Sequence, residues 1–117
     1  MTTDVLGTAL QHLRSGRFAD AEEQLGAILE RTPTDPDAWH LLGVAALHAG
    51  RAGEAADCIV QAISFAAERF AYRIDLALAL CALRRFDAAE ASLRLTIALA
   101  PDAAPAHANL GAVLLGL

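Results

Sequence analysis

Two histidines, His40 and His48, have side chains that could bind a metal ion. They lie eight residues apart, a little more than two turns of an α-helix. They would therefore share roughly one face of a helix without both reaching a single ion. No carboxylate or cysteine at ligand spacing completes a tetrahedral set. We therefore predict no metal site and interpret both histidines as residues that line a surface.

The cysteines and serines lack the surroundings of reactive groups. Cys58 and Cys81 do not form a C-x-x-C motif and are too few for a disulfide scaffold, so we interpret them as reduced, small packing residues. Ser15, Ser64 and Ser92 are not part of a nucleophile elbow, and the sequence has neither a phosphate-binding loop nor an H-E-x-x-H motif. We therefore predict that the chain is not an enzyme and binds no cofactor.

The charged residues argue against nucleic acid as a partner. The formal net charge is −5, and all nine basic residues are arginine. An acidic chain is repelled by a phosphate backbone. Five arginines gather in one part of the sequence, with Glu68 and Glu90 among them: Arg69, Arg73, Arg84, Arg85 and Arg94. They form either a solvated helix surface or a docking patch for an acidic partner.

The mean hydropathy of +0.39 raises the question of a membrane. A spanning helix needs about 18 apolar residues, and the longest apolar run, from Ile74 to Leu83, is interrupted by Asp75 and followed by Arg84. Asp4 precedes any basic residue at the N-terminus, unlike in a secretory signal. We expect a cytoplasmic protein with no membrane contact. The absence of lysine beside abundant alanine, arginine and glycine is typical of a GC-rich bacterial genome.

These residues sit on elements that repeat every 34 residues. Alignment on Trp39 places the starts of successive units at Thr2, Pro36, Phe70 and Ala104, without insertion or deletion. Each unit has the pattern of two amphipathic helices joined by a tight turn. We predict an all-α fold of about seven helices, over residues 3–14, 18–31, 37–48, 52–66, 71–83, 86–99 and 104–115. They form a single domain, 1–117, with repeats at about 2–35, 36–69 and 70–103 and a half repeat at 104–117.

Small residues recur where the two helices of a unit must cross. Interaxial distance depends on the side chains at the contact, so a small residue allows close approach. On the first helices these residues are Ala9, Gly43, Ala77 and Gly111, and on the second helices Ala21, Ala55 and Ala89. Large apolar residues fill the core beside them: Leu42, Leu76, Leu110, Leu25, Ile59 and Leu93.

The turns follow the same register. Gly16 and Gly50 fall where the first helix must end in a left-handed conformation, which glycine adopts without penalty. Arg84 occupies the equivalent place in the third unit and is a departure. Asp35 followed by Pro36 supplies an N-cap and a favoured first helical residue.

The repeated residues resemble the tetratricopeptide repeat family, whose signature is W-x-x-L-G-x-x-Y, then A-x-x-x-F, then P. The second unit carries this pattern as Trp39, Leu42, Gly43, Ala46, Ala55 and Ile59, and the fourth as His107, Leu110, Gly111 and Leu114. The resemblance extends from about Thr2 to Leu117. It implies a right-handed superhelix of antiparallel helix pairs, whose first helices line a concave groove that holds a peptide or helix of a partner protein.

The register predicts which side chains face that groove, and most of them are apolar. They are Leu6, Leu10, Leu13, Arg14, His40, Leu41, Val44, Leu47, His48, Ile74, Asp75, Leu78, Cys81 and Asn109. We expect Leu13, Leu47 and Leu78 to anchor a hydrophobic peptide or an amphipathic helix. The alternative is that neighbouring helices simply cover much of this lining.

Two ligand classes of the family fit poorly. Modules that grip the acidic C-terminus of chaperones use a clamp of Lys, Asn and Arg, but this chain has no lysine, and only Arg14 and Asn109 resemble part of that set. Members attached to glycosyltransferases carry an asparagine ladder, of which Asn109 is the one match.

The final segment, from Leu110 onward, has no charged residue. Repeat arrays usually end in a helix with a polar outer face. Two alternatives follow. In one, the chain is the N-terminal part of a longer protein, such as a glycosyltransferase, in which further repeats cover this segment. In the other, the segment is an assembly surface for a homo-oligomer, formed by Leu110, Val113, Leu114 and Leu117.

Overall fold

The chain is a stack of α-helices, as the computed structural model shows. The structure describes residues 2–116, with side chains from Leu6 to Gly116. Within these residues there are seven helices and no strand. They are α1 Thr2–Arg14, α2 Phe18–Arg31, α3 Pro36–His48, α4 Ala52–Phe65, α5 Phe70–Ala82, α6 Phe86–Leu99 and α7 Ala104–Gly116. Every boundary lies within one residue of its predicted position, so the all-α prediction is confirmed.

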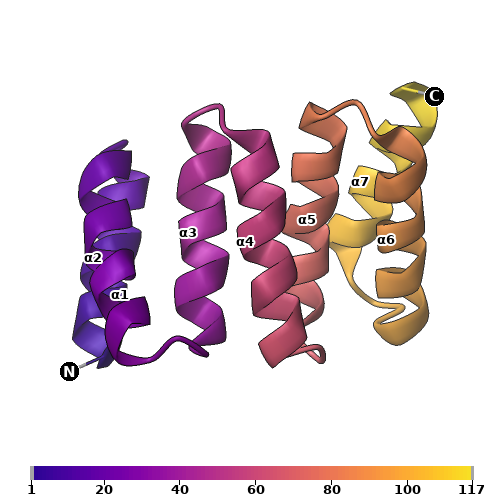
Figure 1. The fold of residues 1–117 in the computed structure, drawn as a ribbon. Helices are drawn as coiled ribbons and strands as arrows, with labels where there is room; N and C mark the ends of the chain where they lie inside the picture. Colours follow the sequence, from indigo (N-terminus) through magenta and orange to yellow (C-terminus); the bar gives the residue numbers. More distant parts are fainter. Residues whose placement is uncertain (1, 117) are drawn as a thin grey trace.

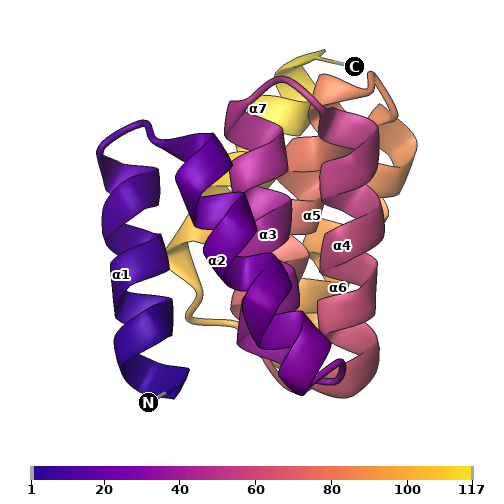
Figure 2. The ribbon, with the colours of Figure 1, turned by 60° about the vertical axis from the view of Figure 1, so that its left-hand side comes forward.

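The helices form antiparallel pairs that stack side by side (Figure 1). Each helix contacts the next along the chain, and the first helices α1, α3, α5 and α7 also contact one another in succession. The turns within pairs lie along one edge of the stack, which we call the turn edge, and the connections between pairs lie along the opposite edge (Figures 1 and 2). The molecule measures 40 × 26 × 20 Å. No helix in residues 2–116 has the length and apolar character of a transmembrane span.

Close helix crossings explain the small residues at the predicted positions. A β-carbon added to Gly43 would lie 2.6 Å from Cγ1 of Ile59 and 3.0 Å from the carbonyl oxygen of Ala55. Helices α3 and α4 can approach this closely because residue 43 has no side chain. At the equivalent Gly111, an added β-carbon would meet no atom within 4 Å, since no helix follows α7 in the described residues.

The turns inside the pairs share a backbone conformation. Gly16, Gly50 and Arg84 have φ values of 76°, 85° and 61°, so all three lie in the left-handed region. Arginine therefore occupies a conformation in the third turn that glycine adopts at lower cost.

One side chain near the start of each of α3, α5 and α7 forms a hydrogen bond with a backbone carbonyl oxygen of the connection that precedes the helix. Trp39 Nε1 donates to the carbonyl of Pro33 at 2.8 Å, and Arg73 Nη2 to that of Ala67 at 3.2 Å. His107 Nε2 lies 2.8 Å from the carbonyl oxygen of Pro101, which can only accept. The three pairs of residues repeat at intervals of 34, so three chemically different side chains do one structural job.

Candidate partner-binding face

The four helices α1, α3, α5 and α7 together form one surface, which we call the first-helix face. Two series of residues, each spaced by 34 positions, run across it from α1 to α7. One series is Leu10, Val44, Leu78 and Ala112, and the other is Leu13, Leu47, Cys81 and Leu115.

Exposure along both series increases toward the C-terminus. Leu10 and Val44 are half-buried, whereas Leu78 is 42% exposed. Leu13 is 9% exposed, while Leu115 at the equivalent position of α7 is 91% exposed. The first-helix face is therefore filled at its N-terminal half and open at its C-terminal half.

Packing between α1 and α3 explains the filled half. Leu6, Leu10, Leu41 and Val44 are partly buried against a core cluster that includes Leu13. Large side chains on both helices occupy the space between them, so neighbouring helices cover much of the lining here.

The predicted lining residues therefore differ in accessibility. Leu13 and Ile74 are buried, so neither is available as an anchor, and Leu47 is half-buried. Leu78 is the most exposed of the three expected anchors. Of the others, Arg14 and His48 are exposed, and the half-buried ones are Leu6, Leu10, His40, Leu41, Val44, Asp75, Cys81 and Asn109.

His40 and Asp75 meet across the interface between α3 and α5. Nε2 of His40 lies 2.5 Å from Oδ2 of Asp75, and the two side chains are 17% and 29% exposed. The imidazole ring also packs on the ring of Tyr72, with centroids 4.6 Å apart. His40 therefore joins two helix pairs, and His48 stacks instead on Phe18 with centroids 5.8 Å apart.

A second polar contact beside it links the same two helices. The Tyr72 hydroxyl donates to Oδ1 of Asp37 at 2.5 Å, and Arg69 Nη1 donates to the same oxygen at 2.6 Å. Burial alone would raise the pKa of Asp37, but the hydrogen bonds from Tyr72 and Arg69 outweigh it and hold this pKa below its usual value. Burial and the Asp37 hydrogen bond together raise the pKa of Tyr72 to about 12.

Sequence reasoning missed both contacts, although a signal for them exists. His40 and Asp75 are 35 residues apart, and so are Asp37 and Tyr72. A residue on one first helix therefore meets the residue one place beyond its own equivalent on the next first helix. A search for polar pairs at 35 residues would have found them.

The end of α7 differs from its prediction. Val113, predicted as part of an assembly surface, is 4% exposed and packs in the core cluster of α5, α6 and α7, and Leu110, predicted on the same surface, packs against that cluster. The reason is that Val113 is equivalent to Ala45 and Ala79, both fully buried, at a position that faces the preceding helix pair. Leu114 is 45% exposed as expected, Leu115 is exposed without having been predicted, and Leu117 lies outside the described residues.

No group of three or more His, Cys, Asp or Glu residues within the described part of the chain is arranged to hold a metal ion. Burial raises the pKa of both the Cys58 and Cys81 thiols, and for Cys58 nearby acidic groups add to the effect. Thiols of this kind are mostly protonated and weakly nucleophilic near neutral pH.

Comparison with known proteins gives one family and many solved structures. The model of the tetratricopeptide repeat family matches residues 6–72. A search of curated proteins gives no match. An O-GlcNAc transferase mutant from Thermobaculum terrenum is 28% identical, with a TM-score of 0.90 over 96% of this chain and 22% of that one.

Two proteins of similar structure, both close to this chain in length, were solved with peptides bound. The first tetratricopeptide repeat domain of Spaghetti (RPAP3), with an HSP90 peptide, has a TM-score of 0.90 at 13% identity, over 97% of this chain and 90% of that one. The Yersinia enterocolitica secretion chaperone SycD, with a peptide of the translocator YopD, has a TM-score of 0.87 at 17% identity, over 98% of this chain and 93% of that one. At these identities the likeness establishes the fold alone.

Proposed function

Because this chain belongs to the tetratricopeptide repeat family, we propose that it is a binding scaffold that holds a peptide or helix of a partner protein on its first-helix face. The observation that carries the proposal is the pair of exposed leucines there, Leu78 at 42% and Leu115 at 91%. They continue the two apolar series that are packed at the N-terminal half of the same face. Exposed apolar side chains aligned in this way mark a surface that another apolar segment covers.

Relatives in structure support this class of function. SycD binds a peptide of YopD, and the RPAP3 domain binds an HSP90 peptide. The ligand of this chain is a different one in our proposal. A chaperone-tail clamp requires lysine, which the sequence lacks, and the open half of the face offers leucines instead.

A second candidate is that the chain is the repeat segment of a larger enzyme. The 28% identity to the Thermobaculum terrenum transferase favours it, and the matched part is 22% of that protein. In that setting the first-helix face would position a protein substrate, so the binding role is the same. We also propose the module boundaries 2–35, 36–69, 70–103 and 104–117.

A third candidate is self-assembly through α7, which the exposure of Leu114 and Leu115 favours. Light scattering over a wide range of protein concentrations separates it from the scaffold role. A dimer that dissociates when Leu115 is changed to Glu supports it, and a monomer at every concentration removes it.

Peptide selection tests the scaffold proposal directly. The chain is immobilised, a library of random peptides of about 12 residues is panned against it, and the selected peptides are measured by fluorescence anisotropy. We expect peptides with two or more large apolar residues. Since burial of one leucine contributes about 1.5–3 kcal/mol, Leu78→Glu is expected to weaken binding by at least about tenfold.

The matched control is Val60→Glu on α4, where the wild-type side chain is 50% exposed but belongs to a second helix. This variant should bind as the wild type does, and circular dichroism should show both variants folded. Loss of binding in Val60→Glu with unchanged binding in Leu78→Glu would place the ligand on the second helices and end the proposal.

A further inference from the structure

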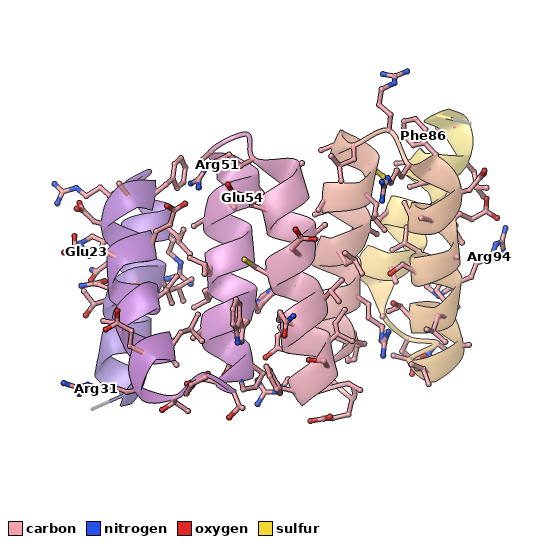
Figure 3. All side chains as sticks on the ribbon, in the orientation of Figure 1. Glu23, Arg31, Arg51, Glu54, Phe86 and Arg94 are labelled. Carbon is pink, nitrogen blue, oxygen red and sulfur yellow. The ribbon has the colours of Figure 1, made fainter. Side chains whose placement is uncertain are left out.

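The open half of the first-helix face ends beside an exposed basic and apolar surface. This C-terminal patch consists of Leu83, Arg84, Arg85, Leu114 and Leu115, all of them exposed. A β-carbon on Gly116 would lie 3.6 Å from Cε1 of Phe86, so the end of α7 adjoins the start of α6. Figures 1 and 2 place the end of α7 beside the α5–α6 turn, and Figure 3 shows Phe86 at the same end.

The two arginines of the patch differ in their ion pairs from the equivalent arginine of the preceding turn. Within the described residues, neither Arg84 nor Arg85 forms an ion pair. Arg51, the equivalent of Arg85 on the preceding turn, pairs with both Glu22 and Glu54. The turn edge is therefore neutralised at the second pair of helices and left positive at the third.

The turn at residue 84 requires a left-handed backbone conformation, but it does not require an arginine. Its φ is 61°, and the two equivalent turns use glycine. A residue with a β-carbon is less favourable there, and such outliers concentrate at functional sites. Its guanidinium lies 5.8 Å from the centre of the Phe86 ring, which supports the side chain from one side and leaves its donors available.

We propose that the C-terminal patch recognises an acidic flank of the peptide bound on the first-helix face, so that the ligand is an apolar segment followed or preceded by carboxylates. This inference rests on the proposed scaffold function and specifies its ligand. Leu115 belongs both to the patch and to the first-helix face, and planar guanidinium groups bind carboxylates through paired hydrogen bonds. The net charge of −5 opposes an acidic peptide at long range, so the preference arises at contact.

The experiment compares three versions of the tightest peptide from the selection, flanked by Glu-Glu, Gln-Gln or Lys-Lys at each end in turn. Anisotropy gives each Kd at about 50 mM and about 300 mM salt, which differ in Debye length by more than a factor of two. At the lower salt, the Glu version should bind about tenfold more tightly than the Lys version when the pair is placed at one particular end of the peptide. The expected effect is of this size because each exposed ion pair contributes modestly and two are formed. The difference should shrink at the higher salt.

The double variant Arg84→Gly and Arg85→Gln should remove this preference and leave binding of the Gln version unchanged. Because glycine adopts the left-handed conformation of residue 84 at lower cost than arginine, the thermal midpoint of the double variant should not fall. A lost preference would therefore not come from unfolding. Arg17→Gln is the matched control, since Arg17 is equivalent to Arg85 and is exposed in the turn between α1 and α2, at the other end of the stack. It should keep the preference.

Each other outcome overturns a defined claim. Equal binding of the three peptides by the wild type, or a preference that survives in the double variant, overturns the acidic-flank inference alone. A preference lost in Arg17→Gln moves the recognition to the other end of the stack and also overturns it. If no peptide can be selected, the scaffold function itself fails, and the inference fails with it.

Discussion

Replacing Gly43 by alanine should destabilise the protein, although alanine is the better helix former. In an exposed helix, Gly→Ala stabilises by about 0.5–1 kcal/mol. At residue 43, however, the new β-carbon would lie 2.6 Å from Ile59 Cγ1 and 3.0 Å from the Ala55 carbonyl oxygen. The Ala55 oxygen belongs to the backbone of α4 and cannot move alone, so the two helices must separate. Overpacking of a core contact costs about 1–3 kcal/mol, which exceeds the gain in helix propensity and leaves a net loss of up to about 2.5 kcal/mol.

Gly111→Ala is the matched control on the equivalent residue of α7. Its β-carbon would meet no atom within 4 Å, so the gain in helix propensity of about 0.5–1 kcal/mol should remain. For a chain of this length, 1 kcal/mol moves the melting temperature by about 3–6 °C. The two chemically identical substitutions should therefore shift the midpoint in opposite directions.

Thermal and urea unfolding followed by circular dichroism and by fluorescence of Trp39, the one tryptophan of the chain, measure both changes. Shortening the clashing side chain gives a further check, because Ile59→Ala should cost less in the Gly43→Ala background than in the wild type. A stabilised Gly43→Ala variant would refute the close crossing of α3 and α4. A destabilised Gly111→Ala variant would mean that another helix covers α7 in solution.

Three further predictions concern backbone strain and the polar contacts between α3 and α5. Arg84→Gly should raise the free energy of unfolding by about 1 kcal/mol, because arginine is strained in the left-handed conformation and glycine is not. Gly50→Ala should lower it, because it places a β-carbon in the same conformation. Urea unfolding measures both changes, and a change of the same sign in the two variants would contradict the strain at these turns. Tyr72 is the one tyrosine of the chain, so its absorbance near 295 nm reports its pKa directly, which should be about 12 and should fall in Asp37→Asn. Since this folded pKa exceeds that of the unfolded chain, the stabilisation is complete below about pH 10 and is lost toward pH 12. The pH dependence from Asp37 has the opposite sign, because its pKa is lowered in the folded state. The ionised Asp37 stabilises the fold above about pH 4, and this stabilisation is lost as the pH falls below that value. Asp37→Asn should therefore weaken the loss of stability in acid, and an unchanged acid-unfolding curve would show that the contact contributes nothing.

The sequence alone determines the helices, their pairing and the small residues at their crossings. Each of these depends on short-range signals that recur with one period: apolar residues at helical spacing, Gly16 and Gly50 in the turns, and the cap at Asp35. A period of 34 residues without insertion allows one well-marked unit, around Trp39 and Gly43, to fix the register of the others. This is why every helix boundary was predicted to within one residue.

Only the tertiary structure decides which side chains of a helix are covered, because that depends on helices far away in the sequence. Leu13 and Leu115 hold equivalent positions, yet one is buried and the other 91% exposed. Val113 is buried because its position faces the preceding pair, which is present, whereas Gly111 faces a position that no helix occupies in residues 2–116. The contact of His40 with Asp75 depends in the same way on the offset of one residue between successive first helices. Periodicity predicts equivalent positions, but the neighbours that make them different appear only when the helices are stacked.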